Sequence, residues 1–159
     1  MFMRKLTWQL LTACLLICAL VVTSALAGPK WLITPEEAAR VRSPAGDFQE
    51  PAAAVEGPGP LIIVRNPKAL QSVRSPVDIF VVFEPGKSGL PPDMSSLNVT
   101  LIGFFDIDIT DRMREYIKTS SLEIEKADLP TDSHQLRMAI KDIDGNSNER
   151  DVVIRVVEE

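Results

Sequence analysis

Three aspartates in the middle of the chain are the first candidates for catalysis. Asp106 and Asp108 are two residues apart, and Asp111 follows them. Two carboxylates at a suitable separation can supply the general acid and the general base of a hydrolase. The spacing favours a structural role, because residues two apart on a strand share one face and an edge strand keeps its solvent face charged. Asp111 suits the positive end of a helical turn. We therefore expect no catalysis from these acids.

A second group of oxygen-bearing side chains lies near the carboxyl end of the chain. Its members are Asp142, Asp144, Asn146, Asn148 and Asp151. Carboxylate and amide oxygens are calcium ligands, but the EF-hand pattern fails because Gly145 directly follows the second aspartate. A looser calcium site at Asp142, Asp144 and Asn146 is one hypothesis. The alternative is a hairpin turn that uses Asp, Gly and Asn for their backbone preferences. No other cofactor is expected.

The sequence lacks the residues that a zinc site or a serine nucleophile would need. His134 is the only histidine, so a zinc site would have to be completed by carboxylates, which is an uncommon ligand set. No G-x-S-x-G elbow marks a serine nucleophile. We expect His134 to be a surface residue at the start of a strand, and the protein to be no enzyme.

The amino-terminal residues have the pattern of an export signal. Arg4 and Lys5 form a basic start, and residues 10–27 carry no charge and end in the small-residue motif Ala25-Leu26-Ala27. This pattern predicts a signal peptide over residues 1–27, cleaved between Ala27 and Gly28. An uncleaved signal anchor is the alternative, and a lipoprotein acylated at Cys14 is a third. Each interpretation places the domain outside the cytoplasm, in the periplasm or the extracellular space.

Cysteine usage and charge narrow the classes of partner. Both cysteines, Cys14 and Cys18, lie in the predicted signal, so the exported domain would contain no disulfide and no thiolate metal site. The 17 basic residues, less Arg4 and Lys5, leave 15 against 22 acidic ones, a net charge of −7 with His134 neutral. So acidic a surface excludes nucleic acid as a partner. We expect contact with a membrane only through the signal segment, if that segment is not cleaved.

Residues 28–60 are predicted to form a Pro- and Ala-rich linker arm. Within it, Thr34-Pro35-Glu36-Glu37 has the spacing of a capping box and predicts a short helix near 35–41. The only bulky apolar cluster of the arm is Trp31-Leu32-Ile33. This cluster would dock a partner, pack back onto the domain, or lie near the membrane.

From residue 61 to residue 157 the apolar residues recur with a period of two, which is typical of strands. Seven short strands are expected near 61–64, 77–83, 97–101, 106–109, 122–125, 136–140 and 152–157. Thr110 is expected to cap one short helical crossover between them. The fold class is therefore all-β, a single two-sheet Greek-key sandwich. The predicted core comprises Ile62, Val64, Ile79, Val81, Leu97, Val99, Leu101, Ile124, Leu136, Met138, Ile140, Val152, Ile154 and Val156.

Three sequence motifs resemble bacterial Ig-like domains of exported proteins. They are Pro76-Val77-Asp78-Ile79-Phe80-Val81-Val82-Phe83, Ser96-Leu97-Asn98-Val99-Thr100-Leu101, and Ala139-Ile140-Lys141-Asp142-Ile143-Asp144-Gly145-Asn146 leading into residues 152–156. The resemblance covers residues 61–157, which contain no tryptophan and no cysteine pair, so an antibody-type core is excluded and a fibronectin-III-like or bacterial Ig-like one is expected. Such domains serve as spacers, adhesion elements or binding modules.

Together these features predict an exported, non-enzymatic binding or structural module of the cell envelope. Its partner would be an envelope protein or a polysaccharide, bound through loops or by strand addition at a sheet edge. The expected contact segments are 86–94, 103–120 and 142–150. Two alternatives belong to other classes: a small periplasmic hydrolase or metal-dependent enzyme that uses the loop carboxylates, and an assembly or chaperone partner in an envelope complex.

Overall fold

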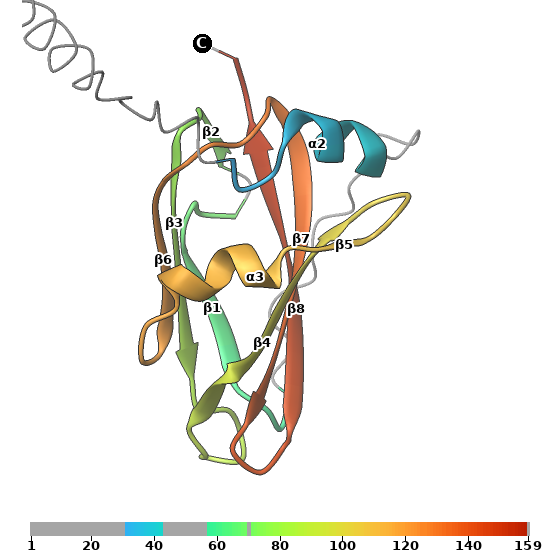
Figure 1. Ribbon diagram of the computed structural model, residues 1–159. Coiled ribbons are helices and arrows are strands. Elements are labelled where there is room, and N and C mark those ends of the chain that lie inside the picture. The colour runs from blue at the N-terminus through green and yellow to red at the C-terminus, as the bar shows by residue number, and fades with distance from the viewer. Residues whose placement is uncertain (1–30, 43–56, 70, 159) are drawn as a thin grey trace, which may run out of the picture.

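The computed structural model describes residues 31–42, 57–69 and 71–158. The predicted signal peptide, its cleavage site between Ala27 and Gly28, and both cysteines lie outside these residues. The described part is an all-β sandwich with short helical segments (Figure 1). Within it, no helix is long and apolar enough to cross a membrane.

Two sheets face each other in the sandwich (Figure 1). The smaller sheet is antiparallel and has the strand order β1 (Leu61–Asn66), β3 (Val77–Glu84), β6 (Ser121–Ala127). The larger has the order β2 (Ser72–Val73), β8 (Ser147–Val156), β7 (Asp132–Asp142), β4 (Pro92–Ile102), β5 (Ile107–Asp108). Only β2 runs parallel to its neighbour. This two-residue strand is one that the sequence pattern did not predict.

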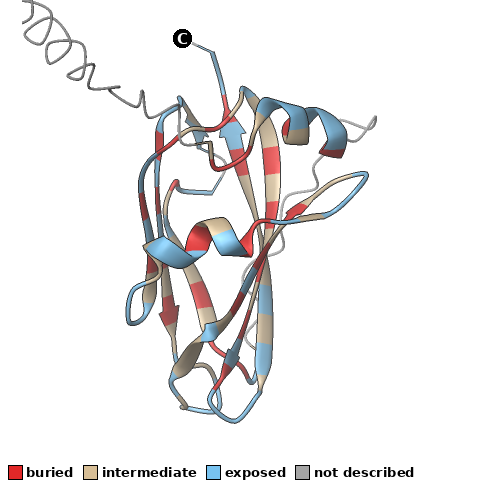
Figure 2. Ribbon diagram, viewed as in Figure 1, coloured by how far each residue is buried: buried red, intermediate tan, exposed pale blue. Residues whose placement is uncertain are grey.

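The core lies between the sheets, and the period-two pattern located most of it. Of the predicted core residues only Val64 and Val152 are half-buried, and the rest are buried (Figure 2). Strand β3 is the centre of its sheet. Its inner face is buried from Val77 to Phe83, while Phe80 on the outer face is 39% exposed.

Several strands are longer than the alternation predicted. Strand β4 begins at Pro92, within the segment expected to be a loop, and pairs with β7 from Asp142 onward. Its register shifts between Asp93 and Asn98, where the Asp93 carboxylate accepts hydrogen bonds from Ser95. Strand β8 likewise begins at Ser147. The polar residues at these strand ends hid the strands from a pattern of hydrophobicity.

The described part of the predicted arm is packed onto the sandwich. Helix α2 (Pro35–Val41) has the capping box that the sequence indicated: the Glu37 N–H donates to the Thr34 hydroxyl (3.2 Å), and the Thr34 N–H donates to the Glu37 carboxylate (3.0 Å). Leu32, Ile33, Ala38 and Val41 are buried in the common core. A domain boundary at residue 61 therefore omits part of the core, and the apolar cluster packs back onto its own domain.

The helical crossover forms where it was predicted, but Thr110 is not its cap. Helix α3 (Thr110–Met113) continues as the 3-10 turn η2 (Arg114–Tyr116), and the cap position is Ile109. The Thr110 hydroxyl instead accepts a hydrogen bond from the Val99 N–H at 2.8 Å. Thr110 therefore fastens the crossover to β4, and Figure 1 shows α3 lying across the front between the two sheets.

Candidate functional site

The predicted calcium residues form a hydrogen-bonded hairpin turn, which we call the clasp: Asp142 with Ser88, Asp144 and Asn146. Both oxygens of Asp142, a residue only 2% exposed, accept hydrogen bonds from the Ser88 hydroxyl (2.7 Å), the Asp144 N–H (3.0 Å), the Asn146 N–H (2.9 Å) and the Asn146 side-chain amide (2.8 Å). Burial alone would raise the pKa of Asp142, but the hydrogen bonds from Asn146 and Ser88 outweigh it and lower the pKa to about 2. Gly145 takes the positive φ of 87° that the turn requires.

This geometry favours the hairpin turn over the calcium site. A carboxylate has about four lone-pair positions, and the donors around Asp142 use them. Asn146 presents its amide N–H rather than its oxygen to Asp142, and Asp144 is exposed. The other two oxygen-bearing residues are engaged elsewhere: Asn148 donates to the Pro60 carbonyl, and Asp151 pairs with Arg137 (2.7 Å). Within the described residues, no three acidic, histidine or cysteine side chains converge on a metal position.

The three candidate catalytic aspartates point to separate partners. The Asp106 carboxylate accepts from the Gly103 N–H (3.2 Å), and Asp111, 93% exposed, pairs with Arg114. Hydrogen bonds from the Thr110 side chain and backbone hold the pKa of Asp108 below its ordinary value, which is the opposite of what a general acid needs. Asp108 does lie on an edge strand, as predicted, although β5 is only two residues long.

His134 is buried, so the expectation of a surface histidine is wrong. It is 2% exposed in β7, where it lies on the same buried face as Leu136 and Met138. Its Nε2–H donates to the Pro130 carbonyl at 2.7 Å. Burial lowers the pKa of His134, although the Pro130 hydrogen bond and the Asp132 charge act in the other direction.

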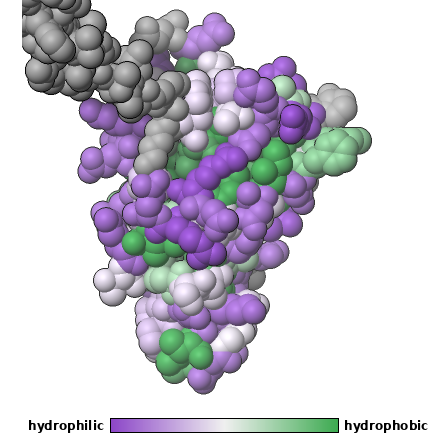
Figure 3. All heavy atoms as spheres, in the orientation of Figure 1, coloured by the Kyte–Doolittle hydropathy of each residue, from purple (hydrophilic) through white to green (hydrophobic). Residues whose placement is uncertain are grey.

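The loop between β4 and β5 carries the most exposed aromatic residues of the described chain. Phe104 and Phe105 are 69% and 65% exposed, and their rings meet edge to face with centroids 4.7 Å apart. The loop projects from one side of the molecule as an apolar knob (Figure 3). Adjacent exposed phenylalanines on one turn contrast with the polar residues that turns favour, and this contrast suggests a binding role.

Helix α2 contacts the backbone of the knob. The Phe104 N–H donates to the Val41 carbonyl at 3.1 Å. Gly103 packs so closely that a Cβ there would lie 2.1 Å from the same Val41 oxygen. The Asp106 carboxylate closes the turn on the Gly103 N–H. The first part of the knob, Gly103 and Phe104, is therefore anchored to helix α2.

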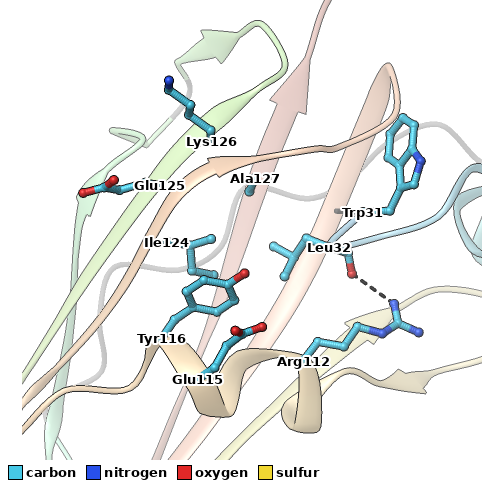
Figure 4. Close-up of a pocket in the computed structure, with 9 residues that line it drawn as sticks. All are labelled: Trp31, Leu32, Arg112, Glu115, Tyr116, Ile124, Glu125, Lys126 and Ala127. Atoms are coloured by element: carbon cyan, nitrogen blue, oxygen red, sulfur yellow. Dashed lines mark hydrogen bonds between the residues drawn. The ribbon is translucent and has the colours of Figure 1, made fainter. Parts of the chain in front are cut away.

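A pocket of about 330 Å³ opens on the opposite end of the crossover, beside β6. The residues that line it are apolar (Trp31, Leu32, Tyr116, Ile124 and Ala127) and charged (Arg112, Glu115, Glu125 and Lys126), and Figure 4 shows the Glu125 and Lys126 side chains pointing away from the Trp31 and Tyr116 rings. Figure 4 shows the Trp31 indole and the Tyr116 ring with Leu32 between them.

One ion pair fixes the pocket to the arm. The Arg112 guanidinium donates to both oxygens of Glu37, with the Nη1–Oε2 distance 2.7 Å, and to the Leu32 carbonyl at 3.0 Å. The hydrogen bond from Arg112 outweighs partial burial and lowers the pKa of Glu37 to about 2, while Glu37 raises the pKa of Arg112. Arg112, whose side chain is 38% exposed, is thereby paired with the less exposed Glu37.

Comparison with protein-family models, curated proteins and solved structures found no match to this chain. The chain's own geometry favours one of the three predicted contact segments. Segment 86–94 is tied to the clasp by Ser88, and segment 142–150 is the clasp itself. Segment 103–120 carries both the aromatic knob and one wall of the pocket.

The sequence patterns selected segment 103–120 as a contact segment but did not single out Phe104, Phe105 or the pocket residues. The pair Phe104-Phe105 between a glycine and an aspartate was a usable signal, because turns seldom place two large apolar side chains in sequence. The pocket had no such signal. Its residues come from three separate stretches, 31–32, 112–116 and 124–127, that only the fold brings together.

Proposed function

We propose that this protein is an exported, non-enzymatic binding module of the cell envelope, built on an Ig-like Greek-key sandwich, and that it binds a protein partner through the Phe104–Phe105 knob. Export rests on the basic start, the uncharged run of residues 10–27 and the small-residue motif before Gly28. The Ig-like interpretation rests on the three sequence motifs and on the packing of a three-stranded against a five-stranded sheet.

The observation that carries the binding role is the exposure of two phenylalanines on a rigid turn. Each ring gains about 1.5–3 kcal/mol when it leaves water for an apolar site. Because the backbone at Gly103 and Phe104 already contacts Val41, binding has to order mainly the two side chains. A rigid protruding apolar knob suits a partner surface with an apolar pocket.

Within the described residues, the three candidate aspartates do not converge, and this arrangement supports a non-enzymatic role. Asp106, Asp108 and Asp111 each bind a different neighbour, and none of them lines the pocket described above. Catalysis by a carboxylate pair requires both groups to reach one reacting bond.

The test is site-specific photo-crosslinking in the envelope of the native cell. Benzoylphenylalanine is placed at position 104 of the full chain, and at position 80 as a control on the outer face of β3. We expect a discrete crosslinked protein from position 104 and none from position 80. The variant F104S/F105S should remove the same protein from co-purification. Equal products at both positions, or none at 104, would contradict the proposal. Amino-terminal mass spectrometry of the purified protein tests export, with Gly28 expected as the first residue.

A further inference from the structure

The Phe104–Phe105 knob and the pocket beside β6 are an apolar projection and an apolar hollow on the same chain. The two rings are 69% and 65% exposed, so neither of them is buried in the pocket. Among the residues that the structure describes, those that line the pocket include none from the β4–β5 loop. One chain therefore displays both halves of an apolar contact without making that contact itself.

Helix α2 separates the two features. The Phe104 N–H donates to the carbonyl of Val41, the last residue of α2, whereas Trp31 and Leu32 of the pocket precede the helix. A helix of seven residues has a length of about 10 Å. Figure 1 shows the β4–β5 loop projecting to the right and β6 lying at the left. A knob can therefore enter the pocket of a second copy but not that of its own chain.

The pocket suits a phenylalanine ring in size and in lining. Its volume of about 330 Å³ lies at the lower end of the range of ligand sites and accommodates one aromatic ring. The rings of Trp31 and Tyr116 lie at its sides (Figure 4), and aromatic side chains favour edge-to-face or offset contacts with a further ring. Because Glu125 and Lys126 point away from these two rings, a phenylalanine seated between them meets apolar groups.

The amide groups at the start of the knob keep their hydrogen bonds when the rings are covered. The Gly103 N–H donates to the Asp106 carboxylate (3.2 Å), and the Phe104 N–H donates to the Val41 carbonyl (3.1 Å). Burial of an unpaired amide is costly, but burial of a paired one is not. Gly103, Phe104 and Phe105 also carry no charge. The knob therefore fits an apolar pocket in its polar groups as well as in its rings.

We propose that copies of this protein associate head to tail, with a phenylalanine ring of one copy seated between Trp31 and Tyr116 of the next. This inference rests on the proposed function of the knob and names its protein partner as a second copy of the chain. The contact joins two different surfaces, so every link leaves one knob and one pocket free at the ends. Association therefore continues beyond two copies, into open chains or closed rings.

The size of the knob makes each link weak. Two phenylalanine side chains bury about 300–500 Å². Stable protein complexes bury about 1,200–2,000 Å² in total, counting both partners. We therefore expect the average mass of the purified protein in sedimentation equilibrium to rise steadily with concentration and to pass the mass of a dimer. A mass that stays at one copy up to about 1 mM would overturn the proposal.

Crosslinking in the native envelope identifies the partner of the knob. Two full-length copies with different tags are produced together, and one of them carries benzoylphenylalanine at position 104. We expect a product with both tags, whose crosslinked peptide contains residues 31–32, 112–116 or 124–127 of the second copy. A product with another protein alone would keep the proposed function of the knob and overturn self-association. A product with both tags joined outside these residues would overturn the seat in the pocket. No product at all would contradict the proposed function as well.

A mixture of two defective variants tests the head-to-tail arrangement. F104S/F105S keeps the pocket but loses the knob, and W31E keeps the knob but places a charge in the pocket. Each variant alone should associate at least tenfold more weakly than the wild type, whereas their mixture should form pairs that stop at two copies. Pairing in the mixture also shows that both variants are folded. If the mixture stays monomeric while the wild type associates, the head-to-tail contact is wrong.

A matched variant and the dependence on salt separate this contact from general stickiness. F80S removes a phenylalanine that is 39% exposed on the outer face of β3, and it should leave association unchanged. The net charge of −5 makes copies repel one another, so added salt should strengthen an apolar contact by screening this repulsion. An equal loss of association in F80S, or dissociation by salt, would overturn the proposal.

Discussion

Arg112 and Glu37 lie 75 residues apart in the sequence, and the guanidinium of the first binds both carboxylate oxygens of the second. Their side chains are 38% and 15% exposed. Because Arg112 also donates to the Leu32 carbonyl, one side chain joins the crossover to helix α2 and to the strand-like segment before it. The arm is therefore part of the folded unit, and it supplies one wall of the pocket.

Replacing Arg112 should loosen the arm. We expect R112A to lower the free energy of unfolding by about 1–2 kcal/mol, because the half-buried Glu37 carboxylate loses two charge-assisted hydrogen bonds while solvent takes up part of the cost. Urea denaturation measures the change. The matched control is R114A, which breaks an ion pair whose side chains are 57% and 93% exposed and should cost less than about 0.5 kcal/mol. Equal costs would refute a structural role for the Arg112–Glu37 pair.

The same pair should shape stability in acid. The Arg112 hydrogen bond lowers the pKa of Glu37 from 4.5 to about 2 in the folded protein. A carboxylate with a depressed folded pKa stabilises the fold fully above its unfolded value, and this contribution disappears as pH falls from 4.5 towards 2. Stability measured across this range should fall less steeply in E37Q than in the wild type. An unchanged slope would mean that Glu37 titrates normally in the folded state.

Gly103 should tolerate no side chain. A Cβ would lie 2.1 Å from the Val41 carbonyl oxygen, so either the knob or helix α2 must move. We expect G103A to cost about 1–3 kcal/mol in thermal or chemical denaturation. It should also weaken crosslinking from position 104, because the rings lose their fixed position. G57A is the control, since its nearest neighbour is the end of the Asn148 side chain at 3.3 Å and it should be close to neutral. A neutral G103A would show that the loop is not held by Val41.

The sequence predicted the sheets better than the connections, for a physical reason. Burial of one face of a strand imposes a period of two on its apolar residues. This period correctly predicted that Leu136, Met138 and Ile140 are buried. The pattern did not predict how the arm packs onto the sandwich. Its contacts are made by single residues, such as Gly103 against Val41, that carry no periodic signal. The pattern did not predict that His134 is buried. A polar side chain can occupy an inward position of a strand only if its polar atoms find partners, and the partner of His134 is the Pro130 carbonyl.

Calcium should not stabilise this protein. The Asp142 carboxylate is occupied by hydrogen-bond donors from Ser88, Asp144 and Asn146, which a cation would have to displace. We expect the Tm to be the same in millimolar calcium and in EDTA at constant ionic strength. D142N should lower the Tm in both solutions alike, because an amide presents an N–H to some of these donors. A rise of Tm with calcium that D142N abolishes would restore the calcium hypothesis.

The buried histidine predicts a loss of stability near neutral pH, well above the range in which the carboxylates titrate. Burial lowers the pKa of His134 from 6.5, so the unfolded chain takes up a proton at a higher pH than the folded chain does. Between these two values the unfolded state binds more protons, and stability must fall as the pH falls below 6.5. Denaturation measured between about pH 7 and pH 5 should show this slope in the wild type. H134Q has no proton to gain there and retains an amide donor for the Pro130 carbonyl, so its slope should be flat. An imidazole pKa of 6.5 or higher, measured by NMR in the folded protein, would show that His134 is stabilised in its charged form and that the sign of this prediction is wrong.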